Sequence, residues 1–173
     1  FRSYFTKTQE TANARMGAYV CIAGDEGMWK NENYFELVDF DEDAAKCVGV
    51  TMLLNIKAED GKKYLWMGPN PFESTLTQVS AEKMFDHQYD TVCKFAEANG
   101  FDGVVVPSAD GAILGACTNR GGTFPDLIKA KRLRTKKGDK KGELQTVQFG
   151  KKHMLGGSYG YEDGALIWQK KAA

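Results

Sequence analysis

The chain has 173 residues, of which 42% are hydrophobic and 27% are charged. This is the size and composition of one globular domain, and it excludes a disordered tail, a collagen-like repeat and a coiled coil. Lysine and arginine together number 23, and so do aspartate and glutamate, which makes the net charge zero. Taken over the whole chain, such a balance counts against a nucleic-acid-binding protein.

The charge is nevertheless unevenly distributed. Residues 1–110 carry 18 acidic and 10 basic side chains, whereas residues 111–173 carry 5 acidic and 13 basic ones. Eight of these bases lie between Lys129 and Lys141, with one aspartate among them. Such a segment is typical of a solvated loop or of a site for phosphate groups, and the sequence leaves both interpretations open.

Cysteine spacing and hydropathy restrict the compartment. No two of the four cysteines form a C-x-x-C pair, so we expect free thiols in a reducing cytoplasm and no metal site. The sequence has no signal peptide and no apolar run long enough for a membrane span, which predicts a cytoplasmic protein without a membrane partner. Because the sequence begins at Phe1 rather than at methionine, we expect it to be part of a larger parent chain.

Hydrophobic periodicity and turn residues predict the elements of the fold. In chain order these are a helix over 8–20, strands over 34–40, 47–56 and 63–67, a helix over 80–99, a strand over 101–106, a helix over 124–133, and strands over 144–149 and 165–168. Residues 156–161 read as a glycine-rich turn. The expected fold is α/β (α+β): one domain over 1–173, with a single mixed sheet, antiparallel hairpins, one long crossover helix and two shorter helices.

Local signals define the ends of several elements. Ser80 is a candidate N-cap of the long helix, and Asn99-Gly100 is a typical helix stop. On one face of this helix the residues are predominantly apolar, among them Cys93. Glu59-Asp60-Gly61 predicts a tight hairpin, and Gly68-Pro-Asn-Pro ends the strand that follows it.

The order of these elements resembles the GNAT N-acetyltransferase fold. The segments 35–54, 63–67, 80–99 and 104–106 take the places of the family's hairpin, central strand, helix and second parallel strand. The resemblance implies a transferase that uses acetyl-CoA or another acyl-CoA, with a small-molecule or peptide acceptor. The turn at 68–75 departs from the family's phosphate-binding pattern, Gln/Arg-x-x-Gly-x-Gly/Ala, and two prolines there each remove a backbone donor.

The resemblance also indicates where a cofactor and an acid would lie. It places the cofactor phosphates at the turn after the central strand, which makes cofactor-binding candidates of Gly68, Asn70, Ser74 and Thr75. It implies that a late tyrosine, Tyr159 or Tyr161, acts as general acid toward the thiolate leaving group.

Asn119 and Arg120 are further binding candidates. They lie in a glycine-rich loop that follows the predicted buried strand over 101–106. Ligands bind at the carboxyl ends of strands in α/β folds, so this loop is expected near the same ligand.

Three alternative functions remain open. Cys117 lies near a predicted helix start, so it could form a thiol hydrolase with His153 as the base. Lys129–Lys141 could serve a non-catalytic binding module for nucleic acid or an acidic protein. The segments 4–12, 53–57 and 99–105 resemble motifs of phage-borne ADP-ribosyltransferase-like domains, although the chain has no Glu-x-Glu or Gln-x-Glu pair.

Overall fold

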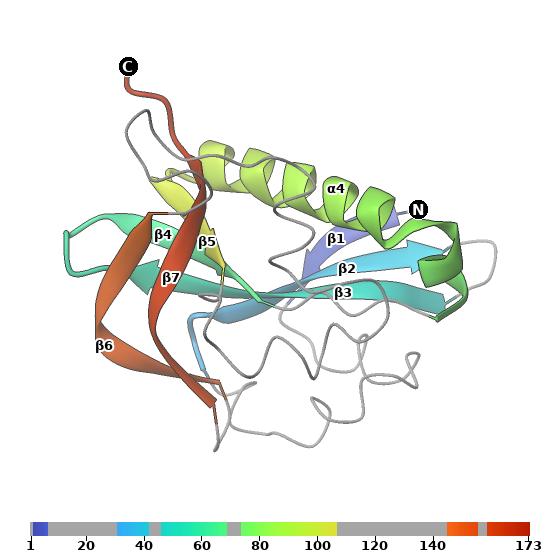
Figure 1. Ribbon diagram of the computed structural model, residues 1–173, viewed down its shortest axis with the longest axis horizontal. Coiled ribbons are helices and arrows are strands. Elements are labelled where there is room, and N and C mark those ends of the chain that lie inside the picture. Colours follow the sequence, from blue (N-terminus) through green and yellow to red (C-terminus); the bar gives the residue numbers. More distant parts are fainter. Residues whose placement is uncertain (1, 7–30, 42–45, 69–73, 107–144, 156–158) are drawn as a thin grey trace.

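The structure, a computed structural model, describes residues 2–6, 31–41, 46–68, 74–106, 145–155 and 159–173 (Figure 1). These residues form seven strands and one helix. The elements are β1 (Arg2–Thr6), β2 (Tyr34–Asp41), β3 (Lys46–Lys57), β4 (Lys63–Met67), α4 (Ser74–Ala98), β5 (Gly103–Val106), β6 (Thr146–Leu155) and β7 (Tyr159–Gln169).

All seven strands belong to one mixed sheet, in the order β1-β2-β3-β4-β5-β7-β6. Strands β4 and β5 pair in parallel, and the other neighbours pair antiparallel. The α+β class, the single mixed sheet, its antiparallel hairpins and one long crossover helix are thereby confirmed. The predicted helices over 8–20 and 124–133 lie outside the described residues.

Helix α4 lies across one face of the sheet (Figure 1). Its residues Val92, Cys93 and Ala96 pack in a buried cluster with apolar side chains of β2, β3, β4 and β5. A second buried cluster, which includes Leu54 and Trp66, occupies the opposite face. Since successive residues of a strand point to opposite faces, burial of both faces explains why β3 reads as a nearly continuous apolar run.

The start of α4 differs from the prediction. The helix begins at Ser74, so Ser80 lies within it and is not its N-cap. The six residues from Ser74 to Val79 include Ser, Thr and Val, whose helix propensity is low. Their sequence therefore gave a weaker helical signal than the segment that follows, although a helix forms there in the folded chain.

The far end of α4 confirms the predicted stop. Gly100 has a φ of +73°, a conformation that glycine adopts readily. The amide of Phe101 donates to the carbonyl of Ala96 at 2.9 Å, and that of Gly100 donates to Glu97 at 3.4 Å. These two bonds form a Schellman motif, which satisfies carbonyl groups that the helix end leaves without partners.

The two ends of the described chain also correct the sequence analysis. Strand β1 was not predicted, and it pairs with β2 over Arg2–Thr6. The predicted turn over 156–161 is wrong in its second half, because β7 already begins at Tyr159. Aromatic residues favour strands, and the backbone pairing with β6 outweighs the flexibility of the intervening glycine.

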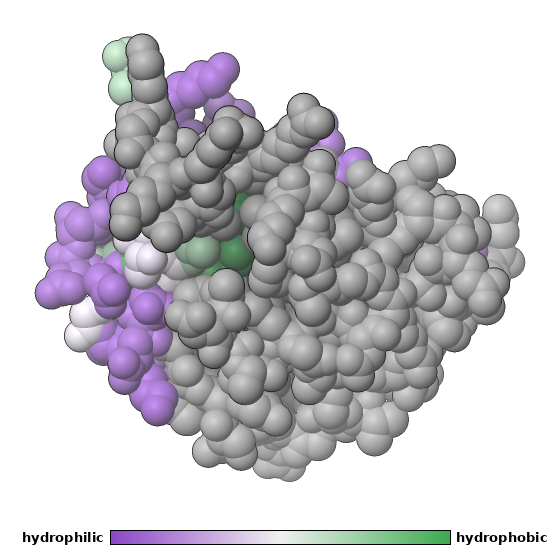
Figure 2. Space-filling model, viewed as in Figure 1, coloured by the Kyte–Doolittle hydropathy of each residue, from purple (hydrophilic) through white to green (hydrophobic). Residues whose placement is uncertain are grey.

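Polar side chains gather at one side of the molecule. Figure 2 shows hydrophilic residues where Figure 1 draws β6 and the β3–β4 hairpin. Strand β6 is an edge strand, and its Lys151 and Lys152 are exposed. Exposed lysines oppose edge-to-edge pairing of strands between molecules. Within the described ranges, no helix combines the length and the apolar character that a membrane span requires.

Replacing Gly100 tests the helix stop. A Cβ at Gly100 would meet nothing within 4 Å, so the substitution changes the backbone preference without a steric clash. We expect Gly100→Ala to lower the free energy of unfolding by about 1 kcal/mol, because a residue with a Cβ disfavours positive φ. Gly100→Asn is the matched control. Its free energy of unfolding should fall by less, since asparagine tolerates this conformation. Urea denaturation measures both, and equal stability of wild type and Gly100→Ala would contradict the assignment.

Candidate functional site

The carboxyl ends of β4 and β5 lie together at one edge of the sheet. The parallel register joins Tyr64 to Gly103, Leu65 to Val104 and Trp66 to Val105. The last residue of each strand, Met67 or Val106, lies beyond this paired register. In open sheets, ligands bind outside the carboxyl ends of strands, so this edge is the first place to look for a site.

Gly68 follows β4 directly and has a packing role. A Cβ at this position would lie 2.6 Å from ring carbons of Trp66, so only glycine lets the chain pass that ring. Its amide donates to the carbonyl of Met52 at 2.8 Å. Because this N–H is already used, a phosphate bound at the turn would depend on N–H groups later in the chain.

Ser74 and Thr75 are the first two residues of α4. The first backbone N–H groups of a helix have no partner within it and carry partial positive charge, which favours anions. The first turn of α4 contains no acidic side chain. The predicted cofactor residues Ser74 and Thr75 are thus placed at a helix start, whereas Asn70 lies outside the described residues.

Two of the predicted catalytic positions are opposite each other. In the β6–β7 register His153 pairs with Tyr161, and Leu155 pairs with Tyr159. The His153 side chain is only 7% exposed, and its ring meets Phe149 edge-on at 5.7 Å. Within the described part of the chain, its Nε2 has no hydrogen-bond partner. Burial, with a smaller effect of Lys151, lowers the pKa of His153 and favours the neutral imidazole.

The remaining predicted site residues lie outside the part of the chain that the structure describes. These are Cys117, Asn119, Arg120 and the basic segment Lys129–Lys141. The thiol hydrolase with Cys117 and His153 and the nucleic-acid module therefore stay predictions. A different thiol, Cys93, is buried as expected, and burial raises its pKa to about 12.

The structure brings together a polar cluster that sequence reasoning missed. Asp39 of β2 is fully buried, and its Oδ1 accepts a hydrogen bond from the Ser3 hydroxyl at 2.7 Å. Its Oδ2 accepts from Gln88 Nε2 at 2.8 Å. His87 Nε2 lies 2.6 Å from Ser3 Oγ and 3.2 Å from Asp39 Oδ1. The opposing residue is Gly49, where a Cβ would come within 3.1 Å of both Asp39 Oδ2 and Gln88 Nε2.

A serine, a histidine and an aspartate in contact suggest a hydrolytic triad, but the geometry opposes it. A nucleophilic serine directs its proton to an imidazole nitrogen, while the carboxylate holds the other ring nitrogen. Here the Ser3 hydroxyl donates to Asp39, and one nitrogen, Nε2 of His87, approaches both groups. The Ser3 proton is thus directed to the carboxylate and not to the imidazole. The cluster therefore joins β1, β2 and α4 without activating Ser3.

A second buried carboxylate lies on the opposite face of β2. The Glu36 side chain is 0% exposed, and its Oε1 accepts the Tyr34 hydroxyl at 2.7 Å, whereas Oε2 has no hydrogen-bond partner among the residues that the structure describes. Burial raises the pKa of Glu36 to about 7, although the bond from Tyr34 opposes the shift. The alternation in β2, with Tyr34 and Val38 two residues away on either side, was the sequence signal for this burial.

Glu36 should make stability depend on pH. Its pKa is about 7 in the fold against an ordinary value of 4.5, so the folded state binds the extra proton between these values. Unfolding free energy should therefore fall as pH rises from about 5 to about 8, by about 3 kcal/mol.

Glu36→Gln should remove the fall in unfolding free energy with rising pH. At pH 8 this variant should be more stable than wild type. Denaturation at several pH values measures it. Glu162→Gln, at an exposed position, is the control and should follow wild type. A Glu36→Gln variant with the same pH profile as wild type would refute the assignment.

No protein-family profile matches the chain, and no curated protein matches it. Among the described residues, no group of three or more His, Cys, Asp or Glu side chains is arranged to hold a metal ion.

Proposed function

We propose that the chain is a GNAT-like acyltransferase that takes its acyl group from a CoA thioester. The supporting observation is the sheet itself. A β2–β3 hairpin leads to β4, α4 crosses to the parallel neighbour β5, and the antiparallel pair β6–β7 closes the sheet beside β5. This order of hairpin, central strand, helix, parallel strand and closing pair supports the proposal, and in the structure β7 lies between β5 and β6.

The proposed acyl site is the edge where β4 and β5 end. In the space-filling view, Figure 2 shows hydrophobic atoms at the place where Figure 1 draws the carboxyl end of β5. An apolar surface suits an acyl group and the chain that carries it. The start of α4 follows β4 in the sequence and offers backbone N–H groups to the CoA phosphates.

In the proposed reaction, the amine of a small molecule or peptide attacks the thioester carbonyl. The new C–N bond forms and the C–S bond breaks, so the amine loses a proton and the CoA thiolate gains one. Backbone N–H groups stabilise the oxyanion. Tyr159 or Tyr161, at the start of β7, would supply the proton to the thiolate.

A substitution that changes the charge at the start of α4 tests this proposal. Ser74→Glu adds a carboxylate where the phosphates would bind, yet it should not destabilise the fold, since acidic residues are favourable at helix starts. We expect it to weaken acetyl-CoA binding by about tenfold or more in calorimetric titration. Glu73 directly precedes Ser74, so Glu73→Gln should tighten binding.

Gln169→Glu is the matched control. Gln169 is exposed at the end of β7, and this substitution makes the same change in net charge as Ser74→Glu. Its affinity for acetyl-CoA should equal that of wild type. The proposal fails if wild type does not bind acetyl-CoA at about 1 mM, the weak limit for a specific ligand. It also fails if Ser74→Glu and Gln169→Glu bind alike.

A further inference from the structure

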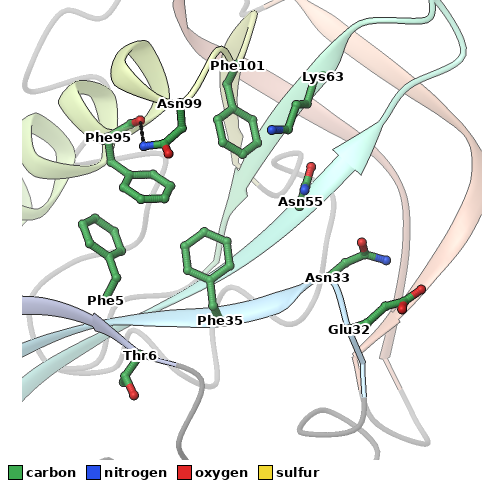
Figure 3. A pocket seen from close by; sticks show the side chains of 10 residues that line it. All are labelled: Phe5, Thr6, Glu32, Asn33, Phe35, Asn55, Lys63, Phe95, Asn99 and Phe101. Atoms are coloured by element: carbon green, nitrogen blue, oxygen red, sulfur yellow. Dashed lines mark hydrogen bonds between the residues drawn. The ribbon is translucent and has the colours of Figure 1, made fainter.

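A cavity of about 410 Å³ opens between the sheet and the carboxyl-terminal end of α4. Four phenylalanines line it, Phe5, Phe35, Phe95 and Phe101, together with polar residues that include Lys63 and Asn55 (Figure 3). Its volume lies within the range of small-molecule sites. None of the catalytic or cofactor-binding candidates of the sequence analysis lines the cavity, whereas Phe5, Asn55 and Phe101 lie in the segments that resemble ADP-ribosyltransferase-like motifs.

The aromatic side chains come from four separate parts of the fold. Phe5 and Phe95 stack with ring centroids 4.2 Å apart, and Phe35 and Phe101 lie 5.6 Å and 6.3 Å from Phe95. Phe5, Phe35 and Phe95 are only partly buried, so part of their ring surface faces the cavity. Figure 3 shows the rings directed toward one another from the surrounding elements.

Two polar groups lie beside the rings, and among the described residues neither forms an ion pair or a side-chain hydrogen bond. The Lys63 ammonium is 4.0 Å from the centre of the Phe101 ring, and none of the described residues forms an ion pair with it. The nearby Asp102 carboxylate accepts the backbone N–H of Lys63 instead. Asn55 is half-buried. Its backbone N–H donates to the carbonyl of Asn33 at 2.9 Å, and among the described residues no group bonds its side-chain amide.

We propose that this cavity binds a small aromatic monocarboxylate. The aromatic ring of the ligand lies against Phe35 and Phe95, and its carboxylate accepts hydrogen bonds from the Lys63 ammonium and the Asn55 amide. Aromatic pairs gain stability beyond the area they bury, and charge-assisted bonds are the stronger kind. The Glu32 carboxylate also lines the cavity, which disfavours a more highly charged phosphate ligand.

This site is independent of the proposed acyl site. Helix α4 has 25 residues, which corresponds to a length of about 37 Å. Its start faces the proposed CoA phosphates, and Asn99, just beyond its other end, lines the cavity. A ligand in the cavity is therefore not the acyl acceptor, and either proposal can fail without the other.

The inference is tested by titrating the wild-type chain with 3-phenylpropionate and following the chemical shifts of the backbone amides. We expect saturable shifts at Phe95, Asn99 and Phe101 below about 10 mM, a limit suited to a ligand of this size. The neutral 3-phenylpropionamide should bind about tenfold more weakly if the carboxylate is recognised. The saturated analogue 3-cyclohexylpropionate should also bind more weakly, because it lacks the aromatic ring.

Substitutions of Lys63 separate recognition from simple apolar binding. Lys63→Met keeps a long side chain. It should weaken the binding of 3-phenylpropionate about tenfold and leave the affinity for 3-phenylpropionamide unchanged. Lys63→Arg should retain binding. Lys62→Met is the matched control, since Lys62 is exposed on the neighbouring hairpin and does not line the cavity.

Three results would overturn the proposal: no saturable shifts in wild type, equal affinity for the acid and its amide, or equal affinity of Lys63→Met and Lys62→Met. If Lys63→Met does not fold, the comparison of acid, amide and cyclohexyl analogue in wild type decides alone.

Discussion

Burial of both faces of the central strands is the constraint on which the rest of the structure depends. Residues such as Leu53 and Leu54 are both fully buried although they point to opposite sides of β3. Water is excluded from either side, so a polar side chain on these strands must find protein partners or remain uncharged. The two buried carboxyl groups of β2 show both solutions. Asp39 accepts hydrogen bonds from β1 and α4, whereas Glu36 accepts one from Tyr34, the only donor among the described residues, and its pKa is raised to about 7.

The side chains between helix α4 and the sheet change in polarity along the length of the helix. Near its carboxyl end the interface consists of aromatic rings, with the Lys63 ammonium over the Phe101 ring, and in its centre it is apolar. Toward its start, the buried groups are Gln88 and Asp39, with His87 at their border. One helix thus presents three environments to one sheet. The two proposed ligands, an acyl-CoA and an aromatic acid, would use opposite ends of it.

Much of the fold could be predicted because its signals are local. The alternation of Tyr34–Asp41, the Asp60-Gly61 turn and the glycine at position 100 each depend on a few adjacent residues. Strand β1 has only five residues, and its register with β2 joins Arg2 to Phe40, so its state depends on distant pairing. The polar cluster could not be predicted for the same reason, since Ser3 and His87 are 84 positions apart. The aromatic cavity likewise combines residues from Phe5 to Phe101.

The position of β1 at the edge of the sheet has a consequence for the solution behaviour of shortened forms. If the first six residues were removed, Asp39 would lose the Ser3 hydroxyl while remaining inside the protein. The outer backbone groups of β2 would also become available along a strand whose Leu37 and Val38 are strongly apolar. An unprotected edge of that kind is a template for strand addition by another molecule. Strand β1 therefore covers the backbone edge of β2 in addition to supplying the Ser3 hydroxyl to Asp39.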